Sequence, residues 1–198
     1  MKKLLTNSIL IATMFATVHS FAATATINND LKPYDEGKMA LTLENVSSGN
    51  SLAIKDSNGM VLYKELIKTS GTYKKGFDLT ALPDGAYVFE LDKDLEIKII
   101  PFTVTANKVA FKKAESKSIF KPYIRQKDNK VLISKLALNG EPVKIDIYAE
   151  TDGVYQLSYS ETIKGVKAIG KVYALKSGAT YKITLKSINK EFTTFINN

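Results

Sequence analysis

The sequence predicts an all-β protein made of two tandem antiparallel β-sandwich modules that follow an N-terminal signal peptide. Three observations favour this fold class. Apolar and polar residues alternate with a period of two, glycine-containing turns separate the alternating runs, and the same order of runs and turns occurs twice. Alternation of this period places apolar side chains on one face of a strand. One buried face and one solvated face are typical of antiparallel sheets.

Residues 1–22 have the features of a signal peptide. Lys2 and Lys3 precede a short apolar run, Ser8–Val18, and small residues follow it at Ala22 and Ala23. The run is shorter than the ~20 residues that a membrane-spanning helix needs. We expect cleavage after Ala22, with cleavage after Ala23 or Ala25 as alternatives, and export by the general secretory route to the periplasm or the outside of the cell. No later segment is long and apolar enough to span a membrane.

The remainder is predicted to form a first module over residues 27–108 and a second over 118–198, with a lysine-rich joint at 109–117. The clearest alternating runs are Leu52–Lys55, Tyr87–Asp92, Leu95–Ile99, Val143–Tyr148, Tyr155–Ser160 and Tyr181–Lys186. Pro101 cannot donate a backbone hydrogen bond, so we expect its strand to lie at a sheet edge or to carry a bulge. Residues 124–138 are the least clear, because their apolar positions fit either period in part.

The two modules are related by an internal repeat. Gly59 matches Gly153, Gly71 matches Gly165, Leu79 matches Tyr173 and Tyr87 matches Tyr181 at a spacing of 94 residues, while Leu82 matches Leu175, Gly85 matches Gly178 and Phe102 matches Phe195 at 93. The matches keep the same order in both halves, which indicates two copies of one supersecondary unit. Gly59 and Gly153 stand between strand-like runs and are typical of hairpin turns.

A signature in the first module resembles a known group of domains. A strand that ends in Asp-x-x-Gly, at Asp56–Gly59, is followed by Leu-Pro-x-Gly-x-Tyr, at Leu82–Tyr87. The stretch Leu41–Val104 is similar to the small Ig-like β-sandwich modules of secreted Bacteroidota proteins, which include the C-terminal sorting domains of the type IX secretion system and related short secreted proteins of unknown function. The resemblance implies an Ig-like fold and a Bacteroidota origin. Whether this internal module is also a transport signal stays open.

Two residues of the signature have a physical explanation of their own. We expect Gly85 to adopt a turn conformation that is closed to residues with side chains. Tyr87 is expected to begin the innermost strand with its ring buried and its hydroxyl bonded to loop backbone, as in a tyrosine corner.

Composition excludes several classes of function. The chain has no cysteine, and its single histidine, His19, leaves with the signal peptide. Serine or cysteine nucleophile triads and histidine metal sites therefore lack members, and we expect no enzyme, no cofactor and no catalytic, cofactor-binding or metal-binding residues. The formal net charge is +8, yet Arg125 is the only arginine in the sequence. Since nucleic-acid recognition relies on arginine, we expect no nucleic-acid partner.

Carboxylates are the remaining candidates for chemistry. Asp92, Asp94 and Glu96 alternate at a hairpin tip and could bind calcium, but a charged turn is the favoured interpretation. Asp56 begins a sequence like that of an EF-hand loop, but Ile67 stands where the last acidic ligand belongs. A further set could serve glycoside hydrolysis only if its members converged in a cleft, and nothing in the pattern indicates that they do. This set is Glu90, Asp146 and Glu150.

The tyrosines bear on binding. We expect core positions for one group and leave another unsettled. The expected core tyrosines are Tyr87, Tyr155, Tyr159 and Tyr181, and the unsettled ones are Tyr63, Tyr73, Tyr148 and Tyr173. The preferred function is a non-catalytic binding or structural module that contacts an unknown protein or envelope component, with free strand edges suited to strand addition. The alternative is a carbohydrate-binding accessory module, which requires coplanar exposed tyrosines such as Tyr148 and Tyr173.

Overall fold

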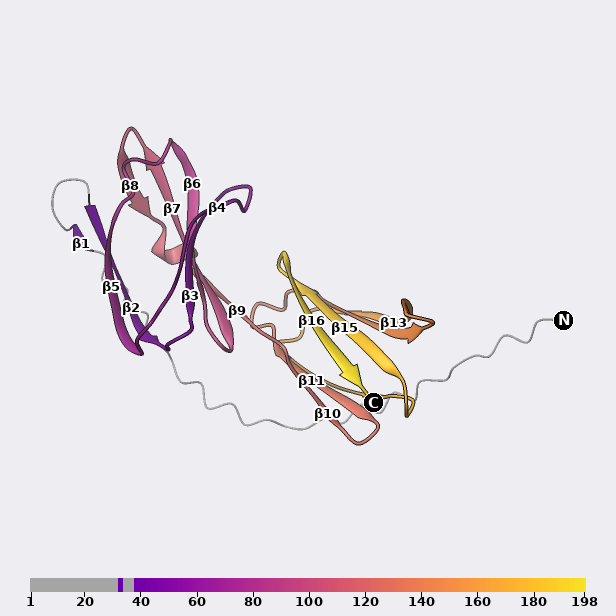
Figure 1. Ribbon diagram of the computed structural model, residues 1–198. Coiled ribbons are helices and arrows are strands. Elements are labelled where there is room, and N and C mark those ends of the chain that lie inside the picture. The colour runs from indigo at the N-terminus through magenta and orange to yellow at the C-terminus, as the bar shows by residue number, and fades with distance from the viewer. Residues whose placement is uncertain (1–31, 34–37) are drawn as a thin grey trace. The chain divides into compact units, whose positions relative to one another are not determined.

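The computed structural model describes residues 32–33 and 38–198, which form strands joined by turns (Figure 1). The predicted signal peptide and its cleavage site lie outside these residues. The all-β prediction is confirmed, because the helical structure in the described part is a single three-residue 3₁₀ turn, η1 (Lys113–Glu115). No helix in this part of the chain is long and apolar enough to cross a membrane.

The described residues divide into two units, one ending at Ile119 and the other beginning at Phe120. In the first unit, one sheet has the order β1-β2-β5 and the other the order β4-β3-β6-β7-β8, with β9 also paired to β7. The strands are β1 (Lys32–Pro33), β2 (Lys38–Val46), β3 (Ser51–Asp56), β4 (Val61–Leu66), β5 (Gly71–Asp78), β6 (Gly85–Asp92), β7 (Glu96–Thr105), β8 (Lys108–Phe111) and β9 (Lys117–Phe120).

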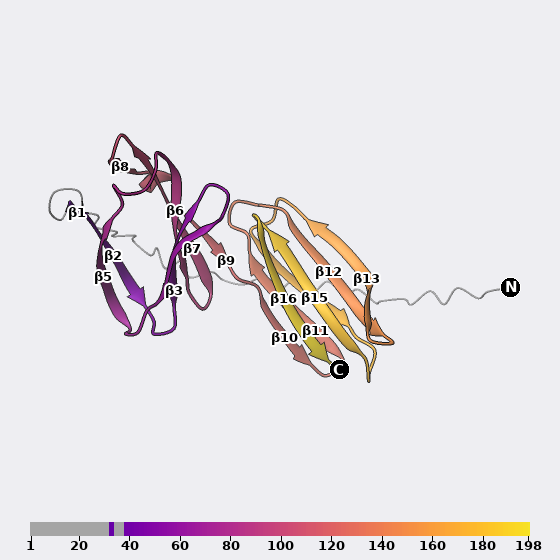
Figure 2. The same ribbon diagram turned by 45° about the horizontal axis from the view of Figure 1, so that its top comes forward.

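The second unit also has two sheets, with the orders β10-β11-β14 and β13-β12-β15-β16. Its strands are β10 (Tyr123–Lys127), β11 (Lys130–Leu136), β12 (Val143–Thr151), β13 (Val154–Ile163), β14 (Ala168–Ala174), β15 (Thr180–Ser187) and β16 (Lys190–Asn197). The least clear segment of the sequence, 124–138, forms the hairpin β10–β11. The four strands of the larger sheet lie side by side in Figure 2, with β16 at one edge. The neighbouring strands in these four sheet orders all run antiparallel to each other, as predicted.

Each unit has a hydrophobic core of its own. The first contains the aromatic pairs Phe77–Phe89 and Phe89–Phe102, with ring centroids 5.3 and 5.2 Å apart. The second is aliphatic around Ile145 and Ile183, both without exposed surface. Burying each such side chain contributes about 1.5–3 kcal/mol. In a chain without cysteine, these two cores provide the main stabilisation.

Tyrosine corners fix the central strand of both units. The Tyr87 hydroxyl donates a hydrogen bond to the Pro83 carbonyl at 2.7 Å, and the Tyr181 hydroxyl accepts one from the Lys176 N–H at 2.9 Å. Both rings are buried, so the prediction for Tyr87 is confirmed. The prediction for Gly85 is wrong. This glycine has no positive φ and is the first residue of extended strand β6, where an added Cβ would make only ordinary contact with Tyr87.

Pro101 lies inside a sheet, contrary to the expected edge or bulge. Strand β7 pairs with β6 without a register shift and has β8 and β9 on its other side. The Pro101 carbonyl accepts a bond from the Lys112 N–H at 2.9 Å. A residue's N–H and C=O point to the same side of a strand, so the missing N–H of Pro101 faces the place where the ladder passes from β8 to β9. Pro101 therefore lies just beyond the end of the β7–β8 ladder, whose pairs run from Phe102 to Thr105.

The predicted joint, residues 109–117, contains most of β8, all of η1 and only the first residue of β9. Strand β8 completes the ladder with β7, pairing Phe111 with Phe102. Phe120 begins the second unit, and its carbonyl accepts a hydrogen bond at 2.7 Å from the ammonium group of Lys135, which is 3% exposed. Burial lowers the pKa of Lys135.

Candidate binding face and edge of the C-terminal sheet

A bulge in the hairpin β12–β13 turns two apolar side chains away from the core. The register shifts between Ile147 and Tyr148, so that Ile147 pairs with Tyr159 but Tyr148 pairs with Leu157. Tyr159 packs against the core, whereas Leu157 is 56% exposed. The prediction that Tyr155 belongs to the core is wrong, because beyond the bulge this ring lies on the outer face. Period-two alternation holds only while the register does.

We call the outer-face cluster of Tyr148, Tyr155, Leu157, Lys182 and Phe195 the aromatic–lysine face. The Lys182 ammonium lies 4.4 Å from the centroid of the Tyr148 ring and 5.3 Å from that of Tyr155. The rings of Tyr155 and Phe195 lean together, with centroids 5.8 Å apart and planes inclined at 57°. Phe195 is 61% exposed, so an aromatic surface is open to solvent around one cation.

Polar side chains occupy the same face beside the aromatic–lysine face. Asp146 is 1% exposed, and its carboxylate accepts bonds from the Ser160 hydroxyl at 2.6 Å and from the Lys144 ammonium at 2.9 Å. Burial raises the pKa of Asp146, but the bonds from Ser160 and Lys144 outweigh it, and the net effect lowers that pKa. A groove of about 440 Å³ lies next to these polar residues, and its lining includes Lys144, Lys186 and Glu191.

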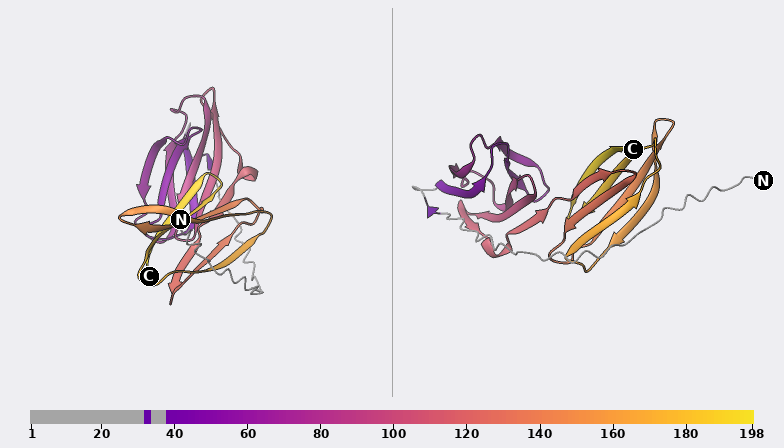
Figure 3. Two further views of the ribbon diagram at one scale, coloured as in Figure 1. Left: turned by 90° about the vertical axis from the view of Figure 1, so that its right-hand side faces the viewer. Right: turned by 90° about the horizontal axis from the view of Figure 1, so that it is seen from below.

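Strand β16 forms the edge of this sheet. Its eight residues pair with β15 without a register shift. The hairpin turn consists of Ile188 and Asn189, both with positive φ, which defines a two-residue type I′ turn. From Phe192 to Asn197 the strand has no charged residue and no proline. The C label marks its end in each view of Figure 3.

The other strands that end a sheet order in the described part carry the features that protect edges. Strands β4, β5 and β13 have register shifts in their ladders, and β8 and β1 are short. Charged residues occur along the outer strands β4, β5, β10, β13 and β14, at Lys64, Glu65, Lys74, Lys75, Arg125, Lys127, Glu161 and Lys171. Among these edges, β16 is the long and regular one with an uncharged stretch.

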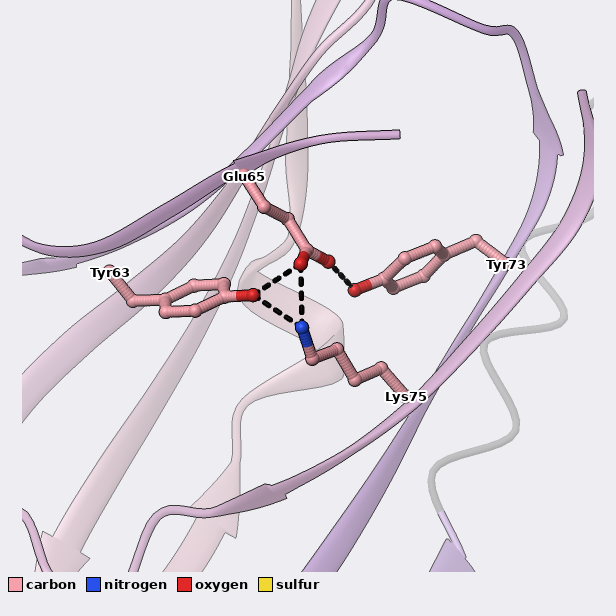
Figure 4. A network of polar contacts seen from close by, with 4 residues as sticks. All are labelled: Tyr63, Glu65, Tyr73 and Lys75. Atoms are coloured by element: carbon pink, nitrogen blue, oxygen red, sulfur yellow. Dashed lines mark hydrogen bonds and ion pairs between the residues drawn. The ribbon is translucent and has the colours of Figure 1, made fainter. Parts of the chain in front are cut away.

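A carboxylate clamp joins strands β4 and β5, which belong to different sheets (Figure 4). Glu65 on β4 accepts hydrogen bonds from the hydroxyls of Tyr63 and Tyr73 and from the Lys75 ammonium, which lies 2.6 Å away. Burial alone would raise the pKa of Glu65, but these three donors outweigh it and lower that pKa. Burial raises the pKa of Tyr73, and the hydrogen bond from its hydroxyl to Glu65 raises that pKa further.

The second unit has a related clamp, in which the tyrosine donor of the facing strand stands at a different position. Glu161 on β13 accepts bonds from the Tyr173 hydroxyl and from the Lys171 ammonium at 3.0 Å, both on β14. The ring pair Tyr159–Tyr173, with centroids 5.5 Å apart, corresponds to Tyr63–Phe77 at 5.4 Å. Burial, followed by the Glu161 hydrogen bond, raises the pKa of Tyr173. Both clamps close one side of a sandwich, so we interpret them as structural.

The clamps correct the alignment of the repeat. Tyr63, Glu65, Lys75, Phe77 and Leu79 correspond to Tyr159, Glu161, Lys171, Tyr173 and Leu175, each pair being 96 residues apart. The predicted matches Leu79–Tyr173 and Leu82–Leu175 are therefore wrong in this stretch, because the hairpin β12–β13 is longer and bulged. Sequence reasoning missed the clamp, although Tyr-x-Glu occurs in both modules.

One further match is wrong at the end of the chain. Phe102 pairs with Tyr87 in the first unit, and Ile196 pairs with Tyr181 in the second. Ile196, which is 6% exposed, is therefore the counterpart of buried Phe102. Phe195 was predicted to be that counterpart, but it points to the outer face.

The structure places the carboxylates that were considered for chemistry in salt bridges and turns. Glu96 lies 3.6 Å from the ammonium groups of both Lys93 and Lys98, at a hairpin turn. Asp56 accepts the N–H groups of Asn58 and Met60 at 2.9 and 2.8 Å, which caps its turn. No group of three potential metal ligands occurs among residues 32–33 and 38–198.

The three residues considered for glycoside hydrolysis do not form one cluster within a unit. Glu90 lies in the first unit and is bridged to Lys55 at 2.9 Å. Asp146 and Glu150 lie on one face of β12 with Tyr148 between them, about 13 Å apart along the strand. The buried Asp146 is engaged by Lys144 and Ser160.

Comparisons with known proteins found solved structures of low similarity to this chain. No family model matches the chain, and no curated protein does. Three similar solved structures are a biofilm-associated protein BSP domain, the chicken CNTN1 FN1–FN3 domains and the Pseudomonas aeruginosa CupB2 chaperone, each with 10% identity. Their TM-scores are 0.26, 0.27 and 0.23, over 83%, 82% and 82% of this chain. The chain spans 28%, 64% and 94% of them. The fold assignment therefore rests on the sheets themselves.

Proposed function

We propose that this chain is a non-catalytic module that binds another protein through the outer face and edge of its C-terminal sheet. One observation carries the proposal: Phe195 and Leu157, exposed by 61% and 56%, gather on one sheet face with Tyr148 and Tyr155. Contiguous exposed apolar surface of this kind marks interaction sites. Aromatic residues are also enriched among the residues that dominate interface energies.

The geometry favours a protein over a sugar. The glycan alternative needs coplanar exposed tyrosines, but Tyr173 is fully buried and the rings of Tyr155 and Phe195 are inclined at 57°. The Lys182 ammonium also lies over the rings of Tyr148 and Tyr155. A flat, open stacking platform is therefore absent from the aromatic–lysine face.

The disposition of the carboxylates supports a non-catalytic role. The most engaged acids, Glu65, Glu161 and Asp146, are each bound to a lysine and to hydroxyl donors. The donors of Glu65 and of Asp146 lower the pKa of each of these two groups. General acid catalysis near neutral pH requires the opposite shift.

Export is part of the proposal. The signal-peptide features of residues 1–22 support a periplasmic or extracellular location. Mass spectrometry of the protein from its native host is expected to give a chain that begins at Ala23. Recovery of the intact chain with Met1 from the cytoplasm would contradict export.

Affinity capture from envelope and medium fractions tests the binding proposal. The Phe195→Ser variant is expected to lose a protein that the unchanged chain retains. The control Leu62→Ser alters an exposed side chain on β4 and should retain that protein. Equal capture by both variants would contradict the assignment of the face, and a specific hit on a glycan array without any protein partner would overturn the ranking of the two functions.

A further inference from the structure

The outward-facing backbone groups of β16 follow from its hairpin. In a two-residue hairpin, the pair that closes the turn, Ser187–Lys190, is hydrogen bonded, and hydrogen-bonded and non-hydrogen-bonded pairs then alternate. The backbone groups of Phe192, Thr194 and Ile196 therefore point to β15. Those of Glu191, Thr193, Phe195 and Asn197 point outward, where β16 has no strand neighbour within the described residues.

We propose that β16 pairs antiparallel with β16 of a second copy of this chain, with Thr194 opposite Thr194 on a two-fold axis. This inference rests on the proposed function, because it names the protein partner of that sheet edge. The two four-stranded sheets then join into one continuous sheet. A two-fold contact of this kind is closed, so it produces a dimer and no fibre.

This register is self-complementary. It places the outward-pointing Thr193 and Phe195 of one copy opposite Phe195 and Thr193 of the other, so that each such pair exchanges two backbone hydrogen bonds. On the inner face, Phe192 lies opposite Ile196, which joins two apolar side chains. The parity of the strand is preserved, so both copies keep their cores on the same side of the joined sheet.

Charge also favours a second copy in this register. Lys190 and Glu191, the charged residues of β16, lie opposite Asn198 and Asn197. Like charges that face each other across a ladder destabilise it, and this register brings none together. The uncharged residues Phe192 to Ile196 meet the same five residues of the second copy. Among the described strands, the other long edges either have charges that interrupt such a stretch or have a register shift in their ladder.

Sedimentation of the full-length mature protein tests the dimer. The unchanged chain is expected to dimerise at micromolar concentration. Thr193→Lys, which places a charge opposite Phe195 of the second copy, is expected to raise the dimer dissociation constant at least tenfold. Thr162→Lys is the matched control, since it adds the same charge at an exposed residue of the opposite edge strand, and it should leave the constant within twofold.

Cross-linking tests the register, and the cysteine-free chain makes the result unambiguous. Opposite residues of a non-hydrogen-bonded pair are about 4.5 Å apart at Cα, within the range for a disulfide. Thr194→Cys is expected to give a covalent dimer under mild oxidation. Thr193→Cys is not, because its two copies are offset along the strands beyond the ~7 Å limit.

The outcomes separate this inference from the proposed function. A chain that stays monomeric at 100 µM and does not cross-link at Thr194 overturns the inference. If that monomer still captures a protein through Phe195, the proposed function stands with a different partner. If Thr193→Cys cross-links and Thr194→Cys does not, the register is wrong.

Discussion

At the scale of single residues, the most informative feature is the carboxylate clamp that occurs in both units. A glutamate on one sheet holds a lysine and a tyrosine from the facing sheet, at Glu65 and again at Glu161. Sandwich sheets are held together mainly by apolar contacts, which do not fix the separation of the outermost strands. A charge-assisted network adds that constraint.

Replacing the clamp carboxylate should destabilise its own unit. We expect Glu65→Gln to lower the free energy of unfolding by about 1–2 kcal/mol, since the amide retains an acceptor but loses the ion pair with Lys75. Urea denaturation measures the change. Glu44→Gln, at an exposed residue, serves as the control and should stay within about 0.5 kcal/mol. Equal effects of the two substitutions would show that the clamp contributes no stability.

The tyrosine corners give a second prediction at this scale. Tyr87→Phe removes the hydroxyl that bonds the Pro83 carbonyl and keeps the buried ring. A loss of about 1 kcal/mol is expected. Tyr123→Phe changes a ring that is 61% exposed and is expected to be neutral. The urea midpoints of the two variants provide the comparison, provided that the denaturant dependence of the unfolding free energy is unchanged. If Tyr87→Phe left the midpoint unchanged, the Tyr87 hydroxyl would not contribute to stability.

At the scale of elements, the hairpin β12–β13 determines which side chains reach the surface. Its extra residues and bulge place Tyr155 and Leu157 outside, although their spacing in the sequence continues that of Tyr159. At the opposite edge of the same sheet, β16 places Phe195 on the outer face and Ile196 in the core. The aromatic–lysine face therefore depends on register and not on composition.

Neighbouring residues of β16 should respond in opposite ways. Ile196→Ala is expected to cost about 2–5 kcal/mol of unfolding free energy, because it leaves a cavity in the core. Phe195→Ala should change stability by less than about 0.5 kcal/mol, because it alters an exposed surface. The unfolding curves of the two variants provide the measurement. If Phe195 were the buried counterpart of Phe102, as the repeat in the sequence suggests, the order would be reversed.

At the scale of the whole molecule, stability depends on two separate cores and on carboxylates that are bound by lysine and hydroxyl donors, without disulfides. The pKa of Glu65 and that of Asp146 are lowered in the folded state. Their contribution is therefore present above the unfolded-state pKa values of ~4.3 and ~3.9. It is lost as the pH falls through the folded-state values.

Acid should therefore weaken the protein in a defined range. We expect the urea midpoint to be nearly constant between about pH 5 and 7 and to fall progressively below about pH 4.5. In Glu65→Gln the fall should be shallower, because one of the groups that takes up a proton is missing. A midpoint that rises on acidification, or the same slope in both proteins, would contradict the role of Glu65.

The all-β class, the antiparallel pairing, the two-module repeat and the buried tyrosine corner at Tyr87 could be predicted from the sequence. These properties follow from alternation and turn residues, which act over a few neighbouring positions. The expectation that Pro101 marks an edge strand or a bulge was wrong, because the effect of a proline depends on which neighbouring strand its missing N–H faces. Here that side is the break between β8 and β9.

The carboxylate clamps, the aromatic–lysine face and the free edge at β16 could not be predicted from the sequence. Each of these depends on which strands become neighbours. Glu65 and Lys75 meet because β4 and β5 flank the same side of a sandwich. Phe195 is exposed because the pairing of β16 with β15 places it opposite Lys182 on the outer face, one residue before the buried Ile196. A local pattern specifies the alternation of a strand, but the long-range pairing of strands specifies which face is buried.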